Sequence, residues 1–208
     1  MEKQKELQLK IFKEFEKLGA EKAATSLTQM LGKKVSVSIS EVRFIEIEKI
    51  AGTFKEEAEK PMTAIHLQMT RQFSGNILLI FTVAEASRLS DILLKEKKED
   101  IAAPELAQSA LKEMGNIITG SYLGCLSETV KKRLLCSPPE LVTDMLQAIL
   151  DGILTHLAFK TPVVAMFEAE FKIENEIVRG YFLLLLEPKN LQEMAEITQE
   201  GKNSTHGL

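Results

Sequence analysis

The stretch SALKEMGNIITGSY, residues 109–122, has the apolar spacing of an amphipathic helix and also carries a line of polar and small residues. With about 100 degrees of rotation per residue, one side of this helix gathers apolar side chains. They are Leu111, Met114, Ile118, Tyr122 and, one turn on, Cys125. The opposite side carries Ser109, Glu113, Asn116 and Gly120. We predict that the apolar side packs into the core and that the opposite side is exposed to solvent.

The exposed line contains residues that a purely structural helix does not need. Asparagine is a mediocre helix former, and a mid-helix glycine costs about 1 kcal/mol relative to alanine. Glu113 and Asn116 place a carboxylate and an amide on neighbouring turns, with the small Gly120 beside them. Two solvated surface residues would explain this pair equally simply, but the unfavourable helix propensities favour a site that a partner approaches closely.

A second helix of the same kind lies 99 positions earlier and has a different exposed line. Its corresponding residues are Lys10, Glu14, Lys17 and Glu21. Opposite charges that alternate at intervals of three and four residues pair with one another on a solvated helix face. We therefore predict that the exposed line of the first helix is an ordinary solvated surface. The exposed line of the helix at 109–122 is the candidate functional site.

The chain reads as two related halves, residues about 1–100 and 101–198. The landmark pairs are Glu14 and Glu113, Pro61 and Pro162, and Gly75 and Gly180, separated by 99, 101 and 105 positions. Similar landmarks at a nearly constant separation indicate an internal duplication, and chance similarity of two ordinary units is the alternative. We predict one domain over 1–208 and an α/β (α+β) fold. It would have a continuous antiparallel-rich sheet, pseudo-twofold symmetry and long helices packed on the sheet.

The predicted elements follow the same order in both halves. In the first half they are a helix at 7–30, strands at 35–47, 62–70 and 74–82, and a helix at 83–100. In the second half they are helices at 104–132 and 141–159, strands at 161–174 and 177–188, and a short helix at 189–197. The polar residues 199–208 are expected to form a disordered tail.

Composition and charge exclude several classes of function. Apolar residues make up 45% and charged residues 27% of the 208 residues, as in ordinary globular proteins. A net charge of -4 predicts no nucleic-acid partner. The N-terminus is charged from the outset and the apolar runs are short, so we expect a cytoplasmic protein without membrane insertion. The two cysteines and three histidines have no metal-ligand spacing, and nucleotide-binding motifs are absent, which predicts no metal and no cofactor in the chain.

The residues around the first stretch resemble the CheC family of chemotaxis phosphatases, which is related to the CheX and FliY proteins. The segments are SALKEMGNIITGSYLGCLSE at 109–128 and GAEKAATSLTQMLGKKVSVSI at 19–39. The family pattern is an acidic residue or serine, three residues, Glu, two residues, Asn, 22 residues and Pro. Ser109, Glu113, Asn116 and Pro139 meet every spacing.

The resemblance implies hydrolysis of the aspartyl-phosphate on the phosphorylated response regulator CheY. Glu113 would form a salt bridge with a lysine of the regulator, and Asn116 would hold the attacking water in line with phosphorus. Ser109 and Pro139 would support this site. The Mg2+ ion of the reaction would belong to the regulator.

One departure from the family concerns the number of sites, which is commonly two, one per half. Glu14 is retained in the first half, but Lys17 stands where the asparagine belongs. Lysine cannot accept a hydrogen bond from water, and its charge would repel the regulator's lysine. We therefore predict a degenerate first site and a single working site in the second half.

Two alternatives stay open. The segment DMLQAIL, 144–150, resembles the family helix that docks the receptor deamidase CheD, with Asp144 as the acidic contact. An ordinary core helix with Asp144 at its solvated edge explains the same residues. For the whole chain, a non-catalytic adaptor that binds phosphorylated CheY, CheD or both is the alternative to an enzyme.

Overall fold

The computed structural model describes residues 2–40, 42–46, 49–54, 60–71, 73–97, 104–154, 163–187, 189–190, 192–193 and 196. The helices are α1 (Glu2–Leu31), α2 (Ile50–Thr53), α3 (Val83–Lys97), α4 (Pro104–Val130) and α5 (Leu146–Leu154). The strands are β1 (Val35–Ile39), β2 (Arg43–Glu46), β3 (Pro61–Arg71), β4 (Gly75–Thr82), β5 (Leu134–Cys136), β6 (Glu140–Met145), β7 (Val163–Ile173) and β8 (Glu176–Leu186).

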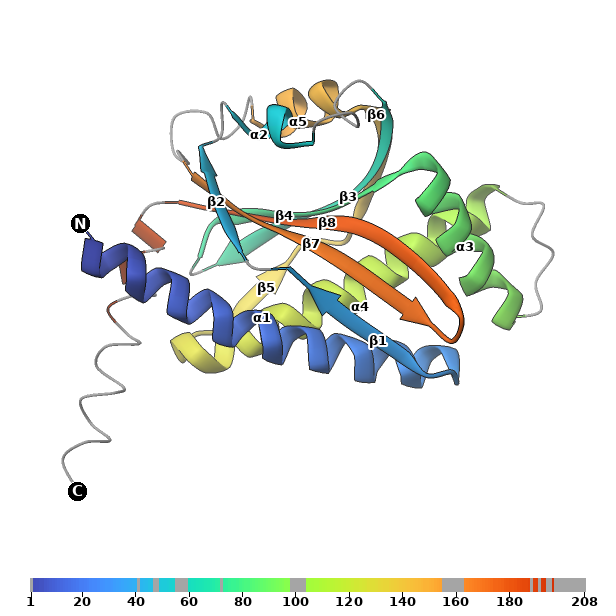
Figure 1. Cartoon of the computed structure of the whole chain (residues 1–208), viewed down its shortest axis with the longest axis horizontal. Coiled ribbons are helices and arrows are strands. Elements are labelled where there is room, and N and C mark those ends of the chain that lie inside the picture. The colour runs from blue at the N-terminus through green and yellow to red at the C-terminus, as the bar shows by residue number, and fades with distance from the viewer. Residues whose placement is uncertain are drawn as a thin grey trace.

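One antiparallel sheet organises the molecule and separates two layers of helices (Figure 1). Its eight strands follow the order β1-β7-β8-β4-β3-β5, with β2 also paired to β7 and β6 also paired to β3. The long helices α1, α3 and α4 cover one face, where Leu27, Leu89 and Met114 belong to one apolar cluster. The short helices α2 and α5 cover the other face through Ile50 and Leu150. The fold class predicted from the sequence is confirmed.

The pairing of the strands agrees with an internal duplication. At the centre, β4 of the first half pairs with β8 of the second, and Leu78 lies opposite Leu183. These partners are 105 positions apart, the same separation as Gly75 and Gly180, as expected where a pseudo-twofold axis passes between equivalent residues. On either side, β1 and β2 pair with β7, whereas β5 and β6 pair with β3. Two strands of each half therefore pair with a strand of the other half.

A pair of polar contacts repeats the same symmetry. Glu85 in α3 accepts a hydrogen bond from the backbone N–H of Arg179 at 3.3 Å. The positions 105 residues away from these two are Asn190 and Ser74, and the Asn190 side chain donates to the Ser74 carbonyl at 2.8 Å. Asn190 therefore lies in the second half where Glu85 lies in the first. The described residues of 189–197 are helical, in agreement with the predicted short helix.

Two glycines allow the halves to meet closely along the β4 and β8 seam. A Cβ atom on Gly75 would lie 2.4 Å from the backbone oxygen of Leu185. A Cβ on Gly180 would lie 2.5 Å from the Phe81 ring and 2.8 Å from the backbone oxygen of Ile80. Real Cβ atoms do not approach other atoms so closely, and the close packing of cores leaves no room to relieve the clash. Each glycine is thus required by a strand of the other half.

One predicted element is wrong in part. The helix expected over 141–159 begins only at Leu146, because residues 140–145 form β6 and pair with β3 from Pro61 to His66. The apolar residues here have the spacing of a helix, namely Leu141, Val142 and Met145. Pairing with β3, about eighty positions earlier in the chain, favours a strand instead. Strand β5, between the helices predicted at 104–132 and 141–159, is missing from the prediction. The strand predicted at 35–47 divides into β1 and β2.

Some predictions concern residues outside the described part of the chain, namely the tail at 199–208, Pro162 and the end of the helix at 155–159. Among the described helices, none is long and apolar enough to cross a membrane.

Candidate functional site

Helix α4 has the two faces that its sequence predicts. On the inner face, the apolar side chains are at most 5% exposed, namely Leu111, Met114, Ile118, Tyr122 and Cys125. On the outer face, the four residues of the polar line are all exposed, namely Ser109, Glu113, Asn116 and Gly120. The helix period alone places the carboxylate and the amide on the open surface of the molecule.

Glu113 and Asn116 are available to a partner. Within the described ranges, neither side chain makes a hydrogen bond or an ion pair with another residue. A Cβ added to Gly120, one turn further on, would meet no atom within 4 Å. The site therefore offers a carboxylate that can pair with a cation and an amide that can both donate and accept hydrogen bonds. A partner's backbone can approach over Gly120.

A groove runs beside Asn116, between α4 and α1. The two helices lie side by side and run in opposite directions (Figure 1). The groove measures about 680 Å³. Its lining consists of Leu18, Glu21, Lys22, Thr25, Ser26, Asn116, Ile117, Gly120, Ser121 and Gly124. Leu18 is 49% exposed, a high value for a large apolar side chain. The sequence analysis missed this groove because it depends on how the two helices pack.

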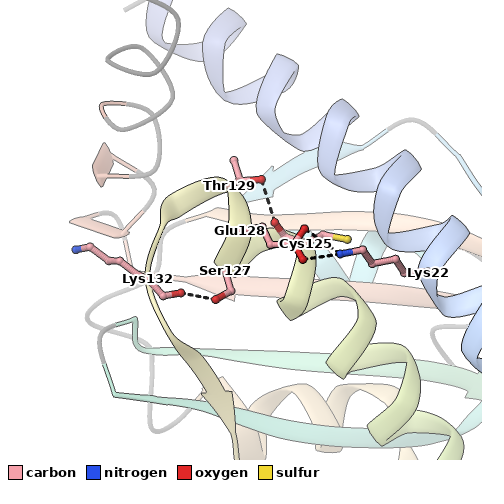
Figure 2. A network of polar contacts seen from close by, with 6 residues as sticks. All are labelled: Lys22, Cys125, Ser127, Glu128, Thr129 and Lys132. Carbon is pink, nitrogen blue, oxygen red and sulfur yellow. Dashed lines mark hydrogen bonds and ion pairs between the residues drawn. The ribbon is translucent and has the colours of Figure 1, made fainter. Parts of the chain in front are cut away.

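A polar network joins the same two helices (Figure 2). The Lys22 ammonium in α1 lies 2.8 and 2.9 Å from the two carboxylate oxygens of Glu128 in α4. This hydrogen bond to Glu128 raises the pKa of Lys22. Further along α4, Ser127 donates to the Lys132 carbonyl at 2.5 Å, beyond the end of the helix. The network ties α1 to the last turns of α4, away from Asn116.

Pro139 lies in the loop that joins β5 to β6, and it is partly buried. Ser137 fixes this loop to β3, because its backbone N–H donates to the Gln68 carbonyl and its hydroxyl accepts from the Gln68 N–H at 3.0 Å. Two residues after Pro139, Leu141 lies opposite Ile65 of β3. The loop that contains Pro139 is therefore attached to β3.

Gly115 brings α4 close to that strand. It is buried, and a Cβ on it would lie 2.7 Å from the Cγ2 atom of Ile65. The sequence analysis did not single out Gly115, although a mid-helix glycine next to Asn116 is itself an unfavourable choice that calls for a packing reason.

The residues of the predicted first site lie on α1. Lys17 is exposed. Glu14 belongs to the same helix, but its side chain lies outside the described part of the structure.

Comparison with known proteins shows which families of proteins this sequence is similar to. A model described as the CheC-like family matches residues 106–143, a segment that contains Ser109, Glu113, Asn116 and Pro139. Residues 106–143 are therefore similar to the CheC-like family. The CheY-P phosphatase CheC of Bacillus subtilis is 29% identical to this chain over 157 residues. The matched region covers 74% of this chain and 75% of that protein.

Two further similarities concern FliY proteins. The flagellar motor switch phosphatase FliY of B. subtilis is 31% identical over 119 residues, which are 56% of this chain but only 30% of FliY. The crystal structure of Thermotoga maritima FliY superposes with a TM-score of 0.71 and 20% identity. That superposition covers 93% of this chain and 96% of the FliY chain, and it supports the same fold.

The predicted contact residue Asp144 lies on a strand and not on a helix. It is exposed near the end of β6, and its carboxylate accepts a hydrogen bond from the Met145 N–H at 2.7 Å. The apolar side chains of Val142 and Met145 on the same strand are 39% and 43% exposed. The helical placement was wrong because β6 pairs with β3, but Asp144 does border an exposed apolar surface.

The described residues contain no group of three His, Cys, Asp or Glu side chains that could hold a metal ion. The two cysteines also lack the features of a nucleophile. Burial raises the pKa of the Cys125 thiol, and it raises the pKa of Cys136 to about 11. A thiol attacks only as its thiolate, so both groups are poor nucleophiles at neutral pH.

We expect slow alkylation of both thiols in the folded chain. With a pKa of about 11, Cys136 is almost entirely protonated at pH 8, and its labelling rate should keep rising up to pH 10. Between pH 9 and pH 10, a thiol with the usual pKa of about 8.5 would gain less than about twofold in rate, whereas Cys136 should gain nearly tenfold. Iodoacetamide labelling followed by mass spectrometry measures both rates, and the urea-unfolded chain provides the fast reference. Rapid labelling of Cys136 at pH 7 would contradict this expectation.

Proposed function

We propose that this chain is a phosphatase that hydrolyses the aspartyl-phosphate of a phosphorylated CheY response regulator. The observation that carries the proposal is the pair of exposed side chains Glu113 and Asn116 on α4, which make no hydrogen bond or ion pair with the described residues and lie inside the segment that matches the CheC-like family. The name of the B. subtilis relative, CheY-P phosphatase CheC, supports the reaction and the partner.

Asn116 orients the attacking water in this proposal. Its side-chain carbonyl accepts a hydrogen bond from the water, and its amide N–H can donate to a phosphoryl oxygen. Phosphoryl transfer depends on positioning and on electrostatic stabilisation, so a group that only holds water in line can supply a large part of the rate. The Mg2+ ion stays with the regulator, and this chain contributes no metal and no cofactor.

Glu113 engages the regulator by an ion pair with a lysine near the phosphorylated aspartate. It lies one turn before Asn116 on the same face of α4, so one partner surface can meet both side chains. Ser109 and Pro139 support the site, Ser109 from the same exposed line and Pro139 from the loop attached to β3. The groove between α1 and α4, with Leu18 on its far wall, is the surface on which the rest of the regulator would lie.

The working site is single in this proposal. Lys17 takes the place of an asparagine in the first half, and an ammonium group has no acceptor for the attacking water. It would also place a positive charge beside the regulator's own lysine. The first half then contributes a wall of the groove and no catalytic group.

The test of this function is the decay of phosphorylated CheY with and without the full chain. Acceleration that turns over many regulator molecules per chain supports the phosphatase. An unchanged decay rate contradicts it. An unchanged rate together with tight binding of phosphorylated CheY would instead support the adaptor, the alternative that the sequence leaves open.

Replacing Glu113 with Gln should weaken the engagement of the regulator more than the chemical step. An ion-paired hydrogen bond contributes about 1.5 kcal/mol or more, which corresponds to roughly a tenfold increase in KM. Steady-state kinetics with phosphorylated CheY measures KM and kcat separately. Glu105→Gln is the matched control, since Glu105 is an exposed carboxylate in the first turn of the same helix. Equal kinetics for Glu113→Gln and the wild type would remove Glu113 from the site.

CheD is a second candidate partner, and the surface around Asp144 favours it. Exposed Val142 lies two residues before Asp144 and on the same side of β6, so an apolar side chain and a carboxylate are available together there. We expect Asp144→Ala to weaken CheD binding measured by calorimetry, and unchanged binding would remove the assignment.

A further inference from the structure

Gly115 lies between the catalytic face of α4 and the sheet. It directly precedes Asn116 in the chain, but it lies about 100 degrees further round the helix and is buried, whereas Asn116 is exposed. A Cβ on Gly115 would meet Cγ2, Cδ1 and Cβ of Ile65 at 2.7, 3.2 and 3.4 Å. The three nearest atoms thus belong to one side chain of β3.

Ile65 cannot move aside to admit a methyl group. It is 0% exposed, and its β-branched side chain has few rotamers available. The strand beneath it is also fixed, because β3 pairs on both sides and Ile65 lies opposite Leu79 in β4 and Leu141 in β6. A larger residue at position 115 must therefore lift α4 away from the sheet.

The other glycines of α4 have no such constraint. A Cβ on Gly120 or on Gly124 would meet no atom within 4 Å. Both line the groove, whereas Gly115 touches the sheet. In the first half, the position 99 residues before Gly115 is Glu16, immediately before Lys17. The half that lacks the asparagine also lacks this glycine.

We propose that Gly115 is a positioning residue for Asn116. By allowing α4 to rest directly on Ile65, it fixes how far the Asn116 amide extends beside a groove whose other wall is α1. A regulator that contacts both helices would then find the amide at the distance needed to hold water against phosphorus. This inference rests on the proposed function for its catalytic consequence, although the packing claim is independent of it.

Gly115→Ala in the full chain tests the proposal. The variant should fold, because alanine favours the helix and the misfit is one methyl group. Displacing a water-positioning group by a fraction of an ångström is expected to lower kcat for phosphorylated CheY about tenfold. KM should stay within about twofold, because Glu113 and the groove still bind the regulator. Gly152→Ala in α5 is the matched control, since a Cβ there meets no atom within 4 Å.

Rescue separates positioning from a general loss of stability. Ile65→Ala in the Gly115→Ala background removes Cγ2 and Cδ1, and should restore kcat to within about threefold of the wild type. If that double variant does not fold, Ile65→Leu removes the Cγ2 branch at constant volume and serves the same purpose. An unchanged kcat in Gly115→Ala would overturn the proposal, as would folded double variants that stay as slow as the single one.

A readout independent of hydrolysis keeps the two proposals distinguishable. In a crystal structure of Gly115→Ala, the distance between the Cα atoms of Asn116 and Ile65 should exceed that of the wild-type chain, and unchanged packing would overturn the inference. If α4 moves but wild-type protein never accelerates CheY dephosphorylation, the packing claim holds and the proposed function fails.

Discussion

Replacing Asn116 with alanine is expected to lower kcat for phosphorylated CheY by about 100-fold or more, which leaves decay close to the spontaneous rate. Alanine has no group that can hold the attacking water. Binding of the regulator should change less than about threefold, because Glu113 and the other residues that line the groove are untouched. The decay of phosphorylated CheY under saturating and subsaturating conditions measures both quantities.

Two further variants make the test specific. Asn116→Asp keeps the size of the side chain and one acceptor but replaces the amide donor with a negative charge beside the phosphoryl group, so it should also be inactive. Lys17→Ala should retain activity. If Lys17→Ala abolishes activity while Asn116→Ala does not, the working site has been assigned to the wrong half.

Replacing Gly180 with alanine is expected to destabilise the fold by about 3 kcal/mol. The new Cβ would lie 2.5 Å from the Phe81 ring and 2.8 Å from the Ile80 carbonyl oxygen, and neither can move without disturbing the pairing of β4 with β8. Overpacked cores lose stability by this order of magnitude. The midpoint of urea unfolding, at a constant m-value, measures the change.

Gly152→Ala provides the control for this prediction too. Gly152 lies in α5, and its substitution should be neutral or stabilising by up to about 1 kcal/mol, because alanine is the better helix former. If Gly180→Ala unfolds at the same urea concentration as Gly152→Ala, the seam between the halves is looser than the distances indicate.

Local periodicity predicted the features that depend on one element. The two faces of α4 follow from a spacing of three and four residues, and the long strands β3, β4, β7 and β8 were predicted to within two residues at each end. The helix predicted for the residues of β6 was wrong, because their pairing with β3 overrides a helix-like spacing. In this pairing, Thr63 lies opposite Thr143. Information about that partner is absent from the local sequence.

Sequence also identified which residues could do chemistry but not how they are held. Glu113 and Asn116 are recognisable by type and spacing, whereas the role of Gly115 depends on Ile65, fifty positions away. The groove next to Asn116 required the packing of α1 on α4, and the surface around Asp144 required the edge position of β6. Each of these features is made by two elements distant in the chain.

The exchange of strands across the sheet also bears on how such a chain could arise and fold. A polypeptide of half this length would expose β3 or β7 without its outer neighbours, and a second copy would supply the missing strands. A gene for one half would therefore encode an obligate homodimer with two identical sites. Joining the copies end to end removes the dependence on protein concentration and would allow one site to lose its function, as we propose for the first half, where Lys17 stands. Because the exchanged strands are far apart in the chain, the fused protein should fold slowly for its size.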